Sequence, residues 1–151
     1  MLSVALSLFI AANVSGELAS IAQAPGQPSR VVVVDIATGN VRDIGPGTND
    51  GAPVWSPDGA WLAFDTDHAS GRGVYIVRAD GSEGRFVSNA FPMNAEPAWS
   101  PDGKRLAYAA GEEQLDRIVV RTIDAGRESV WGTEGVALRL PVWLPDPRMV
   151  A

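Results

Sequence analysis

Short apolar runs, each followed by a small polar turn, recur along the chain. Three of these runs are rich in β-branched residues and cover residues 31–36, 74–77 and 118–120. A turn containing Gly with Asp or Asn follows each of them, and then a second short run, at 41–44, 85–88 and 128–131. Runs of this length bounded by turn residues are typical of strands, and no segment shows a sustained helical period. We therefore predict an all-β fold of short antiparallel strands.

Tryptophans mark a repeat with a fixed period, because Trp55, Trp99 and Trp143 are spaced 44 residues apart. The first two open the same motif, Trp55-Ser56-Pro57-Asp58-Gly59 and Trp99-Ser100-Pro101-Asp102-Gly103, and Trp143 lies in a partial third copy. Proline presets φ for a tight turn, aspartate bonds the nearby backbone, and glycine takes a positive φ, so the motif predicts a hairpin. A period of about 40 to 50 residues with four strands per repeat is typical of β-propeller blades.

The repeat predicts that residues 1–151 form one propeller segment of about three blades. A degenerate first blade is expected over about 5–44, with strands at 5–11, 17–23, 30–37 and 41–44. A second blade is expected over about 51–88, with strands at 51–55, 60–66, 73–79 and 85–88. A third blade is expected over about 95–131, with strands at 95–99, 104–110, 117–123 and 128–131. One further strand, about 137–143, is left over.

The apolar segment 1–12 allows two interpretations. Its length suits the apolar region of a secretory signal peptide, with small residues at Ala11 and Ala12, but the first basic residue is Arg30. The segment is too short to cross a bilayer as a helix. The repeat favours the second interpretation, a buried strand of the first blade.

The composition excludes several kinds of partner and functional site. The chain has 12 basic and 18 acidic residues, a net charge of −6, no cysteine and a single histidine, His68. Nucleic acid is an unsuitable partner for so acidic a chain. The lack of cysteine excludes disulfides and cysteine nucleophiles, and a zinc site with two histidine ligands is impossible. Neither a Gly-x-Ser-x-Gly elbow nor a glycine-rich phosphate loop occurs, so we expect no catalytic, metal or cofactor site.

The segment 96–108, which contains the second motif, resembles the TolB-like repeat, also called the WD40-like PD40 repeat, and the segment 52–64 is similar to it. The resemblance is strong over 51–131, weak over 16–44 and partial over 136–146. It implies a β-propeller with protein partners, such as the peptidoglycan-associated lipoprotein, in a periplasmic or cell-surface setting.

The chain departs from this family in its size. Three blades cannot close a ring, for which about four to eight are needed, and TolB members of the family resemble six-bladed rings. We therefore expect either that the missing blades belong to a longer parent chain or that a homodimer completes a six-bladed ring. In the homodimer, the strand at 137–143 would complete the weak first blade of the partner.

The loops between second and third strands, and those between blades, are expected to share one face. These loops are longer and more varied than the other turns, and binding usually resides on such loops. The candidate partner-contact residues on them are Asp67, His68, Arg72, Phe91, Met93, Glu112, Glu113 and Asp116.

Three of these groups have a second interpretation. Asp65, Asp67 and His68 would suit a metal, but the glycine and the glutamate of a calcium loop are missing, so a polar strand end is preferred. The acidic loop 112–116 either keeps the surface soluble or attracts a basic partner. The apolar tip 91–93 either contacts a partner or folds over the rim.

The preferred function is a non-enzymatic scaffold that binds a protein or peptide, without nucleic acid binding or membrane insertion. The alternative is an accessory propeller fragment of a prolyl-oligopeptidase-like serine peptidase. A stand-alone propeller hydrolase is a third possibility, and the shortage of clustered ligands argues against it.

Overall fold

The computed structural model describes residues 11–12, 16–88, 91–133 and 135–145. Within them the chain is all-β, and none of these residues belongs to a helix that could span a membrane. The strands are β1 (Ala11–Ala12), β2 (Glu17–Ala22), β3 (Arg30–Asp35), β4 (Val41–Asp43), β5 (Val54–Trp55), β6 (Trp61–His68), β7 (Gly71–Arg78), β8 (Arg85–Ser88), β9 (Met93–Trp99), β10 (Arg105–Gly111), β11 (Arg117–Thr122) and β12 (Glu128–Gly132).

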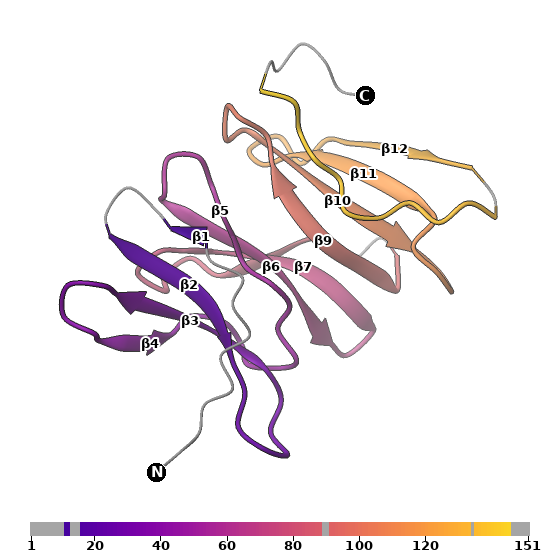
Figure 1. The fold of residues 1–151 in the computed structure, drawn as a ribbon. Helices are drawn as coiled ribbons and strands as arrows, with labels where there is room; N and C mark the ends of the chain where they lie inside the picture. Colours follow the sequence, from indigo (N-terminus) through magenta and orange to yellow (C-terminus); the bar gives the residue numbers. More distant parts are fainter. Residues whose placement is uncertain (1–10, 13–15, 89–90, 134, 146–151) are drawn as a thin grey trace.

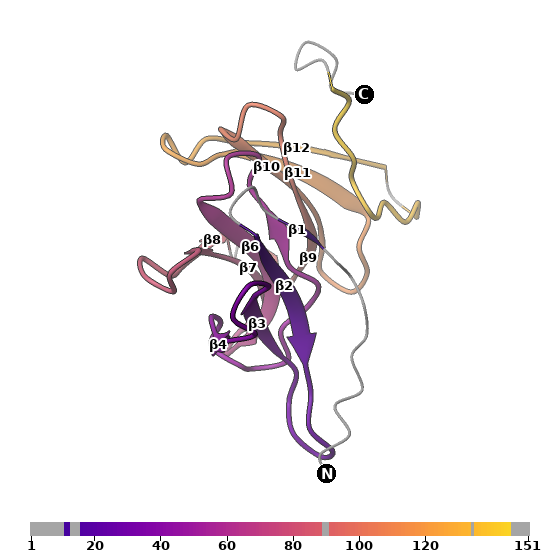
Figure 2. The ribbon, with the colours of Figure 1, turned by 60° about the vertical axis from the view of Figure 1, so that its left-hand side comes forward.

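The strands form three antiparallel groups of four, which we call blade one (β1–β4), blade two (β5–β8) and blade three (β9–β12). Blade one is a separate sheet. Blades two and three join into one eight-stranded sheet through a parallel pair between Arg72 and Met93. Figure 1 shows the blades side by side in chain order, from indigo through magenta to orange, and Figure 2 shows the same order after rotation. The predicted partial propeller is confirmed.

Two apolar clusters hold the blades together. The cluster between blades one and two contains Ala19, Val31, Val33, Ile44, Leu62, Phe64 and Val77. The cluster between blades two and three contains Ala63, Val74, Ile76, Val87, Leu106, Tyr108, Ala110 and Val119. Successive residues of β6 point to opposite faces, so Leu62 and Phe64 pack towards blade one and Ala63 towards blade three. Blade two therefore packs against a neighbour on each face, which explains why its central strands, β6 and β7, are apolar on both sides.

The repeated motif forms the turn between the first and second strands of blades two and three. The hydroxyl of Ser56 donates to the carboxylate of Asp58 at 2.5 Å, and Ser100 donates to Asp102 at 2.5 Å. The N–H two residues after each aspartate donates to the same carboxylate, at 3.0 and 3.1 Å. Gly59 has a φ of 70°, which the turn requires and which side chains disfavour. The pKa of both aspartates is lowered, mainly by the hydrogen bond from the serine hydroxyl and next by the bond from the backbone N–H.

The tryptophans of the motif connect successive blades. The indole N–H of Trp99 donates to the carbonyl of Val54 in the preceding blade at 3.3 Å. The indole of Trp143 donates to the carbonyl of Ala98 at 2.9 Å, one repeat later. The segment 137–145 therefore occupies the position of a first strand in a fourth blade.

This segment corrects one expectation. Residues 137–143 form no regular strand, so the predicted leftover strand is wrong. The N–H of Leu138 donates to the carbonyl of Leu115 at 2.9 Å, and the Trp143 indole fixes the other end. A strand needs a backbone ladder, and none of the described strands pairs with this segment, although side chains join it to β9.

The other strand bounds follow the periodicity in most places. The second, third and fourth strands of blades two and three lie within two residues of the predicted bounds. The first strand of blade two was predicted at 51–55 but covers only Val54–Trp55. Of the predicted strand at 5–11, only Ala11 lies among the described residues, in β1; the two interpretations of segment 1–12 otherwise concern residues outside them.

Candidate functional site

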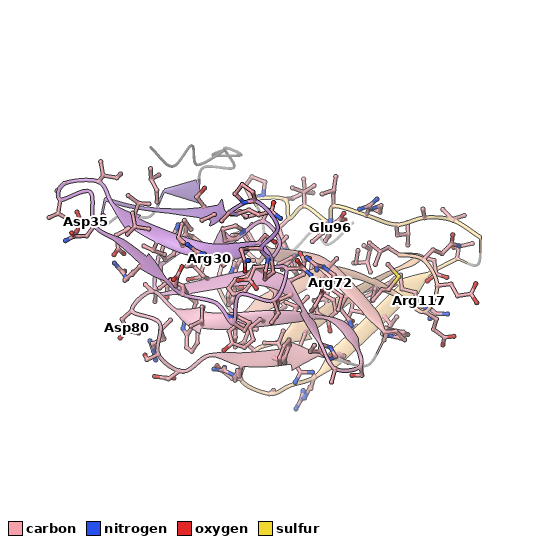
Figure 3. All side chains as sticks on the ribbon, turned by 90° about the horizontal axis from the view of Figure 1, so that it is seen from below. Arg30, Asp35, Arg72, Asp80, Glu96 and Arg117 are labelled. Atoms are coloured by element: carbon pink, nitrogen blue, oxygen red, sulfur yellow. The ribbon has the colours of Figure 1, made fainter. Side chains whose placement is uncertain are left out.

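Three loop segments meet at one end of blades two and three. They are residues 67–72, 91–93 and 111–116. Met93 lies opposite Gly111 in the antiparallel pair of β9 and β10, and it pairs with Arg72 of β7 on its other side. All eight candidate contact residues stand on these segments and therefore share one face. Figure 3 shows Arg117, at the start of β11, on the right and Arg72 near the middle, whereas Asp35 and Asp80, at turns between third and fourth strands, lie on the left.

Arg72 is the centre of a polar cluster on this face. Its Nε donates to Asp65 at 2.5 Å, and its Nη1 donates to Asp67 at 2.7 Å and to the carbonyl of Asn49 at 2.9 Å. Burial by itself lowers the pKa of Arg72, but the charges and hydrogen bonds of Asp65 and Asp67 outweigh it and raise the pKa. Burial likewise opposes ionisation of Asp67, and the bonds from Asn49 and Arg72 prevail to lower its pKa. Arg72 is thus engaged within the chain rather than free for a partner.

Asp65 joins blade two to blade three. Its side chain is only 10% exposed, and besides Arg72 it accepts the N–H of Glu96 in β9 at 3.2 Å. A Cβ placed on Gly51 would lie 2.6 Å from both carboxylate oxygens of Asp65. Glycine at this position lets the connection from blade one pass directly over the carboxylate. Asp65 therefore has a scaffold role.

The geometry does not favour the metal interpretation of Asp65, Asp67 and His68. Arg72 already holds both carboxylates, and among the described residues no group of three His, Asp or Glu is arranged to hold a metal ion. The Nδ1 of His68 faces the N–H of Ser70 at 3.2 Å, and the ring packs edge-on against Phe86 at 5.0 Å. His68 thus points to the aromatic side of blade two and away from a shared ligand set.

The apolar tip and the acidic loop do come together. The guanidinium of Arg117 lies 5.1 Å from the ring centroid of Phe91, which fixes the tip against the start of β11. Met93 lines a cavity of about 310 Å³ with Glu113, Gln114, Leu115, Ala137 and Arg139. A larger cavity of about 670 Å³ adjoins it, lined by Glu112, Glu113, Gln114, Asp116, Arg117, Gly132 and Thr133. The two cavities share Glu113 and Gln114.

One residue of this face was missed by the sequence analysis. Glu96 has a φ of 59° and accepts hydrogen bonds from Arg139, at 2.6 and 3.0 Å, and from the N–H of Leu140, at 2.7 Å. It thereby fixes the wall of the smaller cavity, to which Arg139 contributes. The backbone N–H of Glu96 and the guanidinium of Arg72 both donate to the carboxylate of Asp65, and Figure 3 shows the two residues near the middle of the molecule. Its place in the repeat was visible in the sequence, but its partner lies 43 residues away.

A family model of the TolB β-propeller domain matches residues 13–151. The chain belongs to the TolB β-propeller family. None of the curated proteins matches it.

Solved structures support the same fold. The chain superposes on TolB from Acinetobacter baumannii with a TM-score of 0.68 at 17% identity, covering 82% of this chain and 31% of that one. For the putative TolB from Agrobacterium tumefaciens the TM-score is 0.69 at 20% identity, covering 86% and 51%. For the β-propeller domain of the Trilobed protease from Pyrococcus furiosus it is 0.68 at 14% identity, covering 87% and 44%. This TolB-family chain thus spans from 31% to 51% of the length of these neighbours.

Proposed function

We propose that this TolB-family chain is a non-enzymatic scaffold that binds a protein or peptide at the two adjoining cavities beside the acidic loop. The cavities carry the proposal. They combine acidic side chains at Glu112, Glu113 and Asp116 with apolar walls at Met93 and Leu115. Their two arginines are already engaged within the chain, Arg117 by Asp116 and the Phe91 ring and Arg139 by Glu96. A segment with Lys or Arg next to an apolar side chain complements such a surface.

The fold supports rigid display of these cavities. The loop 111–116 is held between paired strands β10 and β11, and the facing wall is fixed by the Glu96–Arg139 ion pair. A surface that is already ordered loses little conformational entropy when a partner binds. The partner is therefore expected to meet the face in the shape described here.

The test compares two labelled peptides of equal length by fluorescence anisotropy, one with Lys, Arg and Leu and the other with Glu, Asp and Leu. The basic peptide should bind, and the double variant Glu112→Gln/Glu113→Gln should bind it about five- to tenfold more weakly, because two charges at the rim are lost. Both glutamates are exposed, so the unfolding midpoint should not change.

Asp124→Asn is the matched control, because Asp124 is exposed in the turn between β11 and β12, away from the cavities. This variant should bind the basic peptide as the unaltered chain does. Equal binding of the two peptides, or full affinity in the double glutamate variant, would contradict the proposal.

An accessory role beside a serine peptidase is the second candidate. The likeness to the β-propeller domain of the Trilobed protease favours it. In that case the same face would meet polypeptide substrates of a separate catalytic domain, and a hydrolase domain would follow in the same reading frame.

A further inference from the structure

Among the described residues, none covers one face of blade three as the next blade covers the corresponding faces of blades one and two. Ile44, Val87 and Trp131 occupy equivalent positions near the fourth strand of each blade, 43 and 44 residues apart. The first two face the next blade and are only 7% exposed. Trp131 is 51% exposed. The same position is therefore buried wherever a following blade exists.

The facing position on the third strand of each blade is also more exposed in blade three than in blades one and two. Val31 and Val74 are fully buried against the next blade, whereas their counterpart Ile118 is half-buried. Ile118 lies opposite Trp131 in the pairing of β11 with β12, so the two side chains share a face. They form what we call the trailing face.

Blade one has a complementary face at the other end of the molecule. Leu18 and Val34 lie opposite one another in β2 and β3, as Leu62 and Val77 do in β6 and β7. Leu62 and Val77 are 0% and 1% exposed because blade one covers them. Leu18 and Val34 are half-buried, and Val41, opposite Val34 in β4, is 62% exposed. These three residues form the leading face.

The C-terminal segment extends the trailing face inward. Trp143 is fixed to Ala98 as Trp99 is fixed to Val54, which leaves Leu140 and Val142 exposed by 71% and 92%. Apolar side chains presented at an ordered backbone mark an interaction surface.

We propose that the trailing face of one copy binds the leading face of a second copy, so that two chains close one ring of six blades. The contact continues the two blade–blade interfaces already present within the chain. A two-fold axis through the ring would form this contact twice and leave neither face open.

The chain itself favours a second copy as the occupant, because it carries both faces. A second copy therefore presents the complement of each face, in the same geometry as the blade–blade contacts within the chain. Further blades on a longer chain would cover the same faces, and the experiment distinguishes the two cases.

Sedimentation velocity across the micromolar range tests the pairing. The unaltered chain should run at twice 15.9 kDa, about 32 kDa. Trp131→Asp and Val41→Asp should each raise the dimer dissociation constant about tenfold or more, because a charge enters an apolar contact. Phe86→Asp is the matched control: Phe86 is 41% exposed on β8, outside both faces, and the variant should remain a dimer.

Mixing the two interface variants gives the sharpest outcome. A mixed pair has one interface with both substitutions and one with none, so it keeps an unaltered contact that neither variant alone possesses, and mixing should form pairs joined through that contact. A wild-type mass of 15.9 kDa throughout would overturn the proposal, as would equal effects of Trp131→Asp and Phe86→Asp. Circular dichroism confirms that each variant is folded, and either interface variant suffices if the other is not.

Discussion

Individual side chains of the repeated motif stabilise the scaffold through contacts whose partners the sequence pattern does not identify. Each serine and aspartate of the motif closes its own turn. Each described indole bond reaches back by 45 residues to a carbonyl of the preceding first strand. The motif thus combines a local contact with a distant one. This explains why the same five residues recur in two blades.

Two substitutions of Trp99 measure separately how its packing and its hydrogen bond contribute to stability. Trp99→Ala should lower the free energy of unfolding by about 3 kcal/mol, the low end for a large aromatic, because the side chain is half-buried. Trp99→Phe keeps most of the ring but loses the bond to Val54, and should cost about 1 kcal/mol. Urea unfolding measures both. Unchanged stability in Trp99→Ala would refute the scaffold role.

The lowered pKa values of the two turn aspartates predict that the folded chain loses stability in acid. Asp58 and Asp102 have lowered pKa values in the folded chain, so their contribution to stability is present above about pH 4 and is lost as the pH falls through the lowered pKa. Asp58→Asn/Asp102→Asn should therefore show a flatter loss of stability on acidification, measured as urea midpoints from about pH 6 to pH 3. Asp124→Asn, an exposed turn aspartate, should keep the original slope, and a double variant as steep as the unaltered chain would contradict this.

Among the elements, the connection between blades one and two is the least regular. Asp50 is 2% exposed, its N–H donates to the carbonyl of Ser29, and Gly51 donates its N–H to the carbonyl of Asp65. These bonds take backbone groups that an extended β5 would use for its ladder. The first strand of blade two is therefore short although its sequence is apolar.

Gly51→Ala tests this packing of the connection on Asp65. The new Cβ would lie 2.6 Å from the carboxylate oxygens, so we expect a loss of about 1 to 3 kcal/mol. In an Asp65→Ala background the oxygens are gone, and the added cost of Gly51→Ala should fall well below that. Urea unfolding of the four chains measures the coupling. Additive effects would show that the two residues do not crowd one another.

At the scale of the whole molecule, periodicity predicted the blades because the central strands of blade two, β6 and β7, are buried on both faces and carry apolar residues accordingly. It mispredicted 137–143, since this segment is held by single hydrogen bonds, such as those of Leu138 and Trp143, and pairs with none of the described strands. The shared face of the loops was also predictable from strand alternation. The engagement of Arg72 by Asp65 and Asp67 was not, because it depends on how the β6–β7 hairpin closes.

The parallel pair between Arg72 and Met93 makes the contact between blades two and three different in kind from the contact between blades one and two. Blades two and three share backbone hydrogen bonding, whereas blade one meets its neighbour mainly through the apolar cluster and through polar contacts such as Arg42 with the carbonyl of Ala79. On heating or under tension, blade one (indigo in Figure 1) should therefore separate first. Blades two and three (magenta and orange) should then unfold together as one cooperative unit. Domain exchange, where it occurs, would begin at the contact between blades one and two.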